Sequence, residues 1–194
     1  MTSAAVGVAV LFAVVVVERI AELVVSARNS RWSLAHGGRE YASGQVAPMI
    51  LLHVGLLLGC AAEWWFAGAF FPWLGWPMLA LVVLANALRW WCIGTLGHQW
   101  STRVIVVPGL GAVRSGPYRV LPHPNYLAVA IEGAALPLVF TGWITAVAFT
   151  VLNAVFLLGF RIPAETRALH DLRRDPSAEP LPPRPDGPSR EIAG

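Results

Sequence analysis

The chain has 194 residues, of which 56% are hydrophobic and only 13% are charged. Soluble domains carry about 25% charged residues, so this composition excludes a disordered chain and indicates a membrane protein. All 14 basic residues are arginines, spread along the chain without a nucleic-acid-binding motif, so the net charge of +3 predicts no nucleic-acid partner. Cys60 and Cys92 lie in apolar runs with no Cys/His cluster, which predicts neither a disulfide framework nor a zinc site.

Five apolar runs follow one another along the chain, and a membrane-spanning helix needs about 20 such residues. The fourth run is short unless it begins within the proline-rich turn before it, and the break at Thr141-Gly142 predicts that the last two runs form a helical hairpin. Too little polar chain remains to cover five such runs in a soluble fold. We therefore expect an all-α polytopic membrane protein of about five spans, at residues 4–25, 47–71, 73–93, 126–140 and 143–160.

The charge distribution predicts the orientation of these spans. The first run lacks the preceding positive charge and cleavage pattern of a secretory signal, so we read it as a retained helix. Arginines recur in segments 28–45 and 95–125 and from residue 161 onward, whereas the opposite connections carry none. By the positive-inside rule the amino terminus is outside and the carboxyl terminus is cytoplasmic. Residues 175–194 contain six prolines, which predicts a disordered tail.

Charged side chains inside apolar runs are costly and invite a functional interpretation. Glu18 and Glu22 lie four residues apart on one helix face, with Arg19 three residues before Glu22. They form either a helix end at the interface, where Arg19 snorkels and pairs with a carboxylate, or a wall of an active site. His53 is either a hydrogen-bonded core histidine or a catalytic one. Glu132 lies near the loop at residues 115–126, described next. A structural role and a functional role are about equally favoured for it. Glu63 is expected to be solvated at the outer interface.

The segment that tells most about function is the polar, glycine- and proline-rich loop at residues 115–126, which leads directly into the fourth run. Pro122 and Pro124 stiffen the backbone on both sides of His123 and push the preceding residues out of the helical region. Such a loop fixes polar groups in space at low entropic cost. The alternative is an ordinary helix-entry turn with Asn125 as its cap.

A second polar cluster follows the fifth run. Arg161 and Glu165 are four residues apart and share one helix face, and Pro163 suits the first turn of a new helix. One interpretation is membrane anchoring with a surface ion pair worth under about 1 kcal/mol. The other is that this face turns back over the proline-rich loop and closes a single cavity.

Two motifs flank the expected hairpin: Gly116-Pro117-Tyr118-Arg119 with His123-Pro124-Asn125-Tyr126, and then Arg161, Glu165 and Leu169. Over about residues 96–169 the chain resembles the isoprenylcysteine carboxyl methyltransferase family. Pro122 and Thr166 stand where that family has an arginine and a second glutamate. The amino-terminal half resembles a bacterial branch that methylates long-chain alkylpyrones and alkylresorcinols made by type III polyketide synthases.

The resemblance implies an integral-membrane methyltransferase that uses S-adenosylmethionine, held in a pocket on the cytoplasmic side. It also implies that Arg161 is the arginine that orients the acceptor. A phenolic acceptor would need a general base, and the candidates are His53, Glu132 and Glu22. Glu22 is also a candidate for acceptor binding. No G-x-G-x-x-G motif follows a strand, so a Rossmann-type methyltransferase is not supported. The implied cofactor-binding residues are Leu110, Gly111, Ala112, Val113, Tyr118, His123, Pro124, Asn125, Tyr126 and Glu165.

The acceptor must be lipophilic because apolar helices frame the site, and the branch resemblance implies an alkylpyrone or alkylresorcinol, with a polyketide synthase as a functional partner. A prenylcysteine carboxyl group, another lipid carboxyl group and a phospholipid amine are alternative acceptors. A non-catalytic scaffold or transporter subunit is the alternative from a different class. A transporter is expected to show an internal repeat and broken helices in both halves, and the sequence shows neither.

Overall fold

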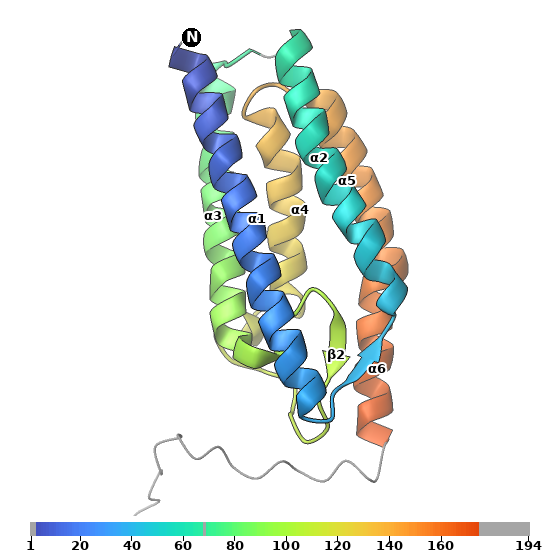
Figure 1. Ribbon diagram of the computed structural model, residues 1–194. Helices are drawn as coiled ribbons and strands as arrows, with labels where there is room; N and C mark the ends of the chain where they lie inside the picture. Colours follow the sequence, from blue (N-terminus) through green and yellow to red (C-terminus); the bar gives the residue numbers. More distant parts are fainter. Residues whose placement is uncertain (1–2, 68, 175–194) are drawn as a thin grey trace, which may run out of the picture.

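The computed structural model describes residues 3–67 and 69–174, so the expected tail at 175–194 lies outside the described residues. The described part is mostly helical, as predicted, and its long helices run side by side (Figure 1). Each of the five apolar runs largely coincides with a helix, although the runs at 47–71 and 126–140 extend past the helix ends at Ala67 and Leu138. The α-helices are α1 (Ser3–Ala35), α2 (Val46–Ala67), α3 (Pro72–Leu96), α4 (Pro124–Leu138), α5 (Trp143–Phe156) and α6 (Ile162–Arg174).

A small antiparallel sheet lies at the end of the molecule where α1 ends and α6 lies (Figure 1). Strand β1 (Arg39–Tyr41) pairs with β2 (Val104–Val106), with Glu40 opposite Ile105. The sequence did not predict these strands, because three residues are too few to show an alternating pattern. The sheet ties the segment after α1 to the loop after α3.

The hairpin of α4 and α5 is confirmed, and a side chain from α2 holds its tip. Thr141 adopts a left-handed conformation with φ of 60° between the two helices. The Glu63 carboxylate accepts hydrogen bonds from the backbone N–H groups of Ile144 at 3.1 Å and Thr145 at 2.7 Å. Glu63 thus caps the first turn of α5, a structural contact that the expected solvation at the interface did not include.

The last two helices form one continuous rod. A π-helical segment, Leu157–Arg161, joins α5 to α6, and Pro163 lies in the first turn of α6, as expected. Proline has no N–H to give to the preceding turn, and the wider π segment lies directly before it. Such π segments occur often at functional sites, and this one ends on Arg161.

Three helical stretches of the described residues are long and apolar enough to cross a membrane, by length and composition: Ser43–Phe66, Pro72–Gln99 and Trp143–Ala168. The protein is therefore a mostly helical membrane protein. The α4 helix has only 15 residues, and α1 contains Glu18, Arg19 and Glu22. Five spans and the orientation of the termini stay predictions.

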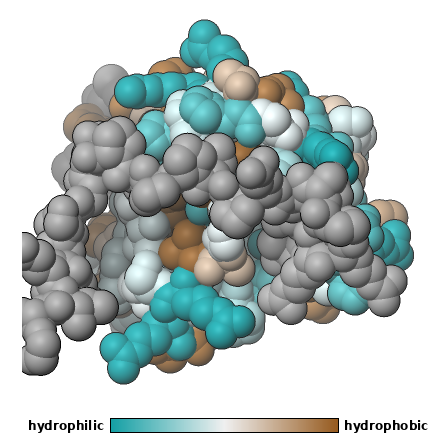
Figure 2. All heavy atoms as spheres, turned by 90° about the horizontal axis from the view of Figure 1, so that it is seen from below, coloured by the Kyte–Doolittle hydropathy of each residue, from teal (hydrophilic) through white to brown (hydrophobic). Residues whose placement is uncertain are grey.

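The two ends of the helical bundle differ in character. Trp65, Trp73, Trp76 and Trp143 are exposed and belong to the end where α2 finishes and α3 and α5 begin (Figure 1). The opposite end, seen in Figure 2, carries many hydrophilic side chains, with hydrophobic ones visible between them. The apolar core lies between the helices and includes Val15, Leu56, Cys60, Val82, Ala135, Leu136, Val139 and Phe149.

Candidate functional site: a cavity between the helices and the proline-rich loop

One cavity of about 400 Å³ lies among the helices next to the sheet. Residues of α1 to α5, of β2 and of the loop after it line this cavity, and Arg161 and Glu165 complete the wall. Pro124 is fully buried in the first turn of α4, and neither it nor Glu132 lines the cavity. The predicted site residues that do line it are Glu22, His53, Leu110, Gly111, Ala112, Val113, Tyr118, His123, Asn125, Tyr126, Arg161 and Glu165.

The proline-rich loop and the face of α6 meet at this cavity. The Tyr126 hydroxyl donates a hydrogen bond to Oε2 of Glu165 at 2.5 Å. Nδ1 of His123 lies 3.8 Å from the same oxygen, and the His123 and Tyr126 rings stack with their centroids 5.4 Å apart. About a third of the His123 and Glu165 side chains is exposed. The prediction that the two segments close on each other is confirmed.

Asn125 is part of the cavity wall. The helix begins at Pro124, and His123 occupies the cap position without a capping side-chain bond, so the expectation that Asn125 is the helix cap is wrong. Its Oδ1 atom is buried and has no hydrogen-bond partner among the described residues. A buried polar atom of this kind requires an explanation, and a bound ligand supplies one.

Arg161 is a buried cation, at 5% exposure. Its Nη2 donates a hydrogen bond to the backbone carbonyl of Thr102 at 2.6 Å, so the residue bridges the end of the π segment and the loop before β2. The alternative of a surface ion pair with Glu165 is wrong for Arg161, because the guanidinium is buried. The Tyr126 hydroxyl also lies within hydrogen-bonding reach of the guanidinium, and the N–H groups that are left are suited to an anionic oxygen in the cavity.

Tyr118 lies in a short 3₁₀ segment, Gly116–Arg119, beside the apolar stretch 110–113 of the cavity wall. Burial raises the pKa of Tyr118 well above its usual range, and the neighbouring Cys92 and the more distant Glu165 add to the effect. Its hydroxyl therefore stays protonated at neutral pH, and it can pack against a ligand and donate a hydrogen bond.

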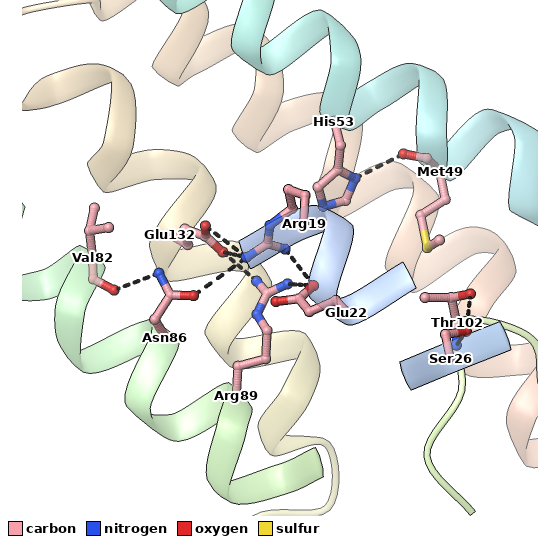
Figure 3. Close-up of polar contacts among 10 residues, drawn as sticks. All are labelled: Arg19, Glu22, Ser26, Met49, His53, Val82, Asn86, Arg89, Thr102 and Glu132. Carbon is pink, nitrogen blue, oxygen red and sulfur yellow. Dashed lines mark hydrogen bonds and ion pairs between the residues drawn. The ribbon is translucent and has the colours of Figure 1, made fainter. Parts of the chain in front are cut away.

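Four charged side chains from three helices form a buried cluster at the edge of the cavity (Figure 3). We call Arg19, Glu22, Arg89 and Glu132 the charge cluster. Arg19 contacts Glu22 at 2.9 Å and Glu132 at 3.1 Å, and Arg89 contacts Glu22 at 3.1 Å and also pairs with Glu132. Asn86 extends the network, since its Oδ1 lies 3.4 Å from Nη2 of Arg19.

The cluster changes how three of the sequence predictions are interpreted. The local pair of Arg19 and Glu22 is confirmed, but both side chains are mostly buried instead of snorkelling to an interface. Arg89 was missed as a site residue, although it is the lone charge in its apolar run and such charges are costly in a membrane. Both carboxylate oxygens of Glu132 accept hydrogen bonds from arginines, a geometry that favours a structural part. A base function for Glu132 stays a prediction.

His53 also has a structural contact. Its Nδ1 lies 2.8 Å from the Met49 carbonyl oxygen one turn earlier in α2. A carbonyl only accepts, so Nδ1 carries the proton and Nε2 keeps a free lone pair in the neutral ring. The ring lines the cavity and points toward Arg19 (Figure 3). Its catalytic function stays a prediction.

Comparison with known proteins agrees with this geometry. Residues 78–171 match the isoprenylcysteine carboxyl methyltransferase family model, and the matched region contains the proline-rich loop, Arg161 and Glu165. The chain is 34% identical over 171 residues to the uncharacterized protein YpbQ of Bacillus subtilis (strain 168), covering 83% of this chain and 95% of that protein.

The chain belongs to the isoprenylcysteine carboxyl methyltransferase family. It is a membrane methyltransferase, and the family match covers both walls that meet at Tyr126 and Glu165. No solved structure matches the chain significantly. Arg19, Glu22 and His53 precede the matched region, so their part in the site depends on the geometry described above.

Proposed function

We propose that this isoprenylcysteine carboxyl methyltransferase family member transfers a methyl group from S-adenosylmethionine to an oxygen of a lipophilic acceptor. The acceptor class that we propose is a long-chain alkylpyrone or alkylresorcinol. One observation carries the proposal: a single cavity of about 400 Å³ joins the polar groups of Tyr126 and Glu165 to an apolar region between α1, α2 and α5.

The residues at the polar end fit the methyl donor. The unpartnered Oδ1 of Asn125 offers a buried hydrogen-bond acceptor, the Glu165 carboxylate suits an ammonium or ribose hydroxyls, and Tyr118 and Tyr126 offer aromatic faces to a cationic ligand. Small-molecule pockets have volumes of about 300–1,000 Å³, a range that includes this cavity. When bound, S-adenosylmethionine supplies a methyl group already activated by its sulfonium.

The protein's own task is then to hold the acceptor oxygen about 3–3.5 Å from that carbon in a dry site. Arg161 suits this task, because a buried guanidinium orients an anionic oxygen in a fixed direction. The acceptor oxygen bonds to the methyl carbon as the carbon–sulfur bond breaks. An ionised acceptor releases no proton, whereas a phenol gives its proton to a base. His53 is our candidate base because its Nε2 is free, whereas two arginines hold each of the Glu22 and Glu132 carboxylates.

Apolar side chains between α1 and α2 support entry of the acceptor from the lipid. Leu23, Ile50 and Val54 line the cavity and are also 41–47% exposed. We propose five spans, with the amino terminus outside and the arginine-rich end, which contains Glu165, in the cytoplasm. The acceptor then arrives from the bilayer and the methyl donor from water.

A second acceptor class, the carboxyl group of a prenylated cysteine, has support from Arg161, because a guanidinium pairs well with a carboxylate. The two classes can be separated by incubating membranes with methyl-labelled S-adenosylmethionine and three acceptors: a long-chain alkylpyrone, an alkylresorcinol and farnesylated cysteine. We expect label in the pyrone or the resorcinol. Label in farnesylated cysteine alone would support the second class, and a polyketide synthase as functional partner would then lose its basis.

Arg161→Ala tests the site in the same assay. We expect this variant to insert into the membrane and to lose methyl transfer. Arg31→Ala is the matched control, because Arg31 is exposed and, among the described residues, hydrogen-bonds only the carbonyl of Ala27 in its own helix. Wild-type turnover in Arg161→Ala would refute the assignment.

A further inference from the structure

The end of the cavity farthest from Glu165 contains hydrogen-bonding groups that the protein does not satisfy. Three helices contribute them: Glu22 from α1, His53 from α2 and Asn153 from α5, and all three line the cavity. We call these three residues the inner polar site. None of the three is among the residues proposed to hold the methyl donor, and His53 is also the candidate base for a phenolic acceptor.

Asn153 is the clearest case. The residue is only 3% exposed and lies in the last turn of α5, just before the π segment. No group in residues 3–67 or 69–174 hydrogen-bonds its amide. The amide faces the cavity, and it offers both N–H donors and a carbonyl acceptor. Asn153 is therefore poised for a partner that enters the cavity.

Glu22 contributes an acceptor to the same end. Its Oε2 forms ion pairs with both Arg19 and Arg89, whereas its Oε1 is buried and has no partner among the described residues. The charge cluster is balanced, with two arginines and two glutamates. Nε of Arg19 and Nε of Arg89 are also buried without a partner among the described residues. An added anion would find no net positive charge in the cluster, whereas a neutral hydroxyl could donate to Oε1 of Glu22.

His53 adds a second acceptor. Its Nδ1 is bound to the Met49 carbonyl, which leaves the lone pair of Nε2 available. The ring packs edge-on against Phe149 with centroids 5.7 Å apart, and Phe149 is one turn before Asn153 on α5. His53 and Asn153 are therefore neighbours along one wall of the cavity.

The inner polar site is separate from the methyl-donor end. Arg161 follows Asn153 by eight residues, about two helical turns, on the same helical rod. The cavity wall between them is apolar and includes Val129, Phe156 and Leu157. Polar groups of a ligand therefore have two distinct places in this cavity.

We propose that the inner polar site binds a neutral hydroxyl group of the acceptor and so selects hydroxylated ring lipids over lipid carboxylates. The inference rests on the proposed function and narrows its acceptor class. A hydroxyl donates its proton to Glu22 or His53 and accepts from the Asn153 amide. A carboxylate would bring a negative charge to a cluster that has no net positive charge, beside the unpartnered oxygen of Glu22.

The test is lipid binding to the purified full chain in nanodiscs, measured by calorimetry with three probes of equal chain length. The probes are a 5-alkylresorcinol, its dimethyl ether and the corresponding fatty acid. For the wild type we expect the resorcinol to bind at least about tenfold more tightly than the ether or the fatty acid. Asn153→Leu keeps the side-chain volume and removes the hydrogen bonds, so we expect it to reduce that preference about tenfold.

Thr150→Leu is the matched control, because Thr150 is exposed on the outer side of the same helix and its variant should keep the wild-type preference. His53→Phe is a second variant that leaves the charge cluster intact, and it should also weaken the preference. Equal binding of resorcinol and ether to the wild type, or an equal loss for all three probes in Asn153→Leu, would overturn the inference and leave water as the occupant.

Binding of S-adenosylhomocysteine to the same samples separates this inference from the proposed function. We expect Asn153→Leu to bind it as the wild type does, because Asn153 is far from the methyl-donor end. A wild type that selects the resorcinol but binds no S-adenosylhomocysteine would refute the methyltransferase site and support the inner polar site. The reverse result would refute only the inner polar site.

Discussion

The hydroxyl of Tyr126 donates a hydrogen bond to the Glu165 carboxylate at 2.5 Å, across 39 residues of sequence. This contact joins the first turn of α4 to α6. Pro124 fixes the start of α4, and the π segment that ends at Arg161 sets the face that α6 presents. The α4–α5 hairpin lies between the two motifs and returns the chain to the same end of the bundle, so that together they form one wall.

The charge cluster predicts a large effect of removing one arginine. Arg89→Leu leaves Glu22 and Glu132 with Arg19 alone in a buried site. Breaking a buried ion pair in this way costs about 3–5 kcal/mol, so we expect a clear fall in the melting temperature of the detergent-solubilised protein. The melting temperature is measured by heating the protein and recording the loss of its monodisperse peak in size-exclusion chromatography.

Arg103→Leu provides the control for this measurement. Arg103 pairs with Glu40 at 3.2 Å, with 47% of its side chain exposed, and such pairs contribute under about 1 kcal/mol. The charge-balanced double variant Arg89→Leu with Glu22→Leu should recover part of the lost stability. Equal melting temperatures for Arg89→Leu and Arg103→Leu would contradict the buried network.

The close packing of α2 against α5 depends on a glycine. A Cβ at Gly59 would lie 2.6 Å from Oγ1 of Thr145, whereas a Cβ at Gly55, one turn earlier, meets nothing within 4 Å. We expect Gly59→Ala to destabilise the protein by about 1–3 kcal/mol. Gly55→Ala should be as stable as the wild type or slightly more so, because alanine favours a helix. The same thermal assay compares the two, and a reversed order would refute this packing.

Glu63 predicts a capping effect between helices. Glu63→Ala removes the acceptor for the N–H groups of Ile144 and Thr145, which should cost about 1 kcal/mol. Glu63→Gln keeps one acceptor oxygen and should lose less. Hydrogen exchange at the start of α5 reports the effect locally, and unchanged protection there in Glu63→Ala would show that Glu63 is no cap.

Local signals in the sequence predicted the helices and the meeting of the two motifs. Long apolar runs give helices by themselves, and Pro124 and Thr141-Gly142 mark where the hairpin begins and turns. The spacing of Arg161 and Glu165 places both on one face. These features depend on a few neighbouring residues, so the sequence alone reveals them.

Contacts between distant elements were not predictable in the same way. The pairing of Arg89 with Glu22 and Glu132 depends on how α1, α3 and α4 pack, and no local pattern encodes that packing. The three-residue strands β1 and β2 form only because the helices bring them together. The free amide of Asn153 has no sequence signal at all, since one asparagine in an apolar run is equally compatible with a satisfied core residue.

Calorimetric titration of S-adenosylhomocysteine tests the central claim, that the loop and α6 form one methyl-donor pocket. We expect saturable binding to the wild type, about tenfold weaker binding for Tyr126→Phe and His123→Ala, and a larger loss for Glu165→Ala. Arg31→Ala should bind as the wild type does. No saturable binding to well-folded wild-type protein, or equal affinity in all variants, would contradict the claim.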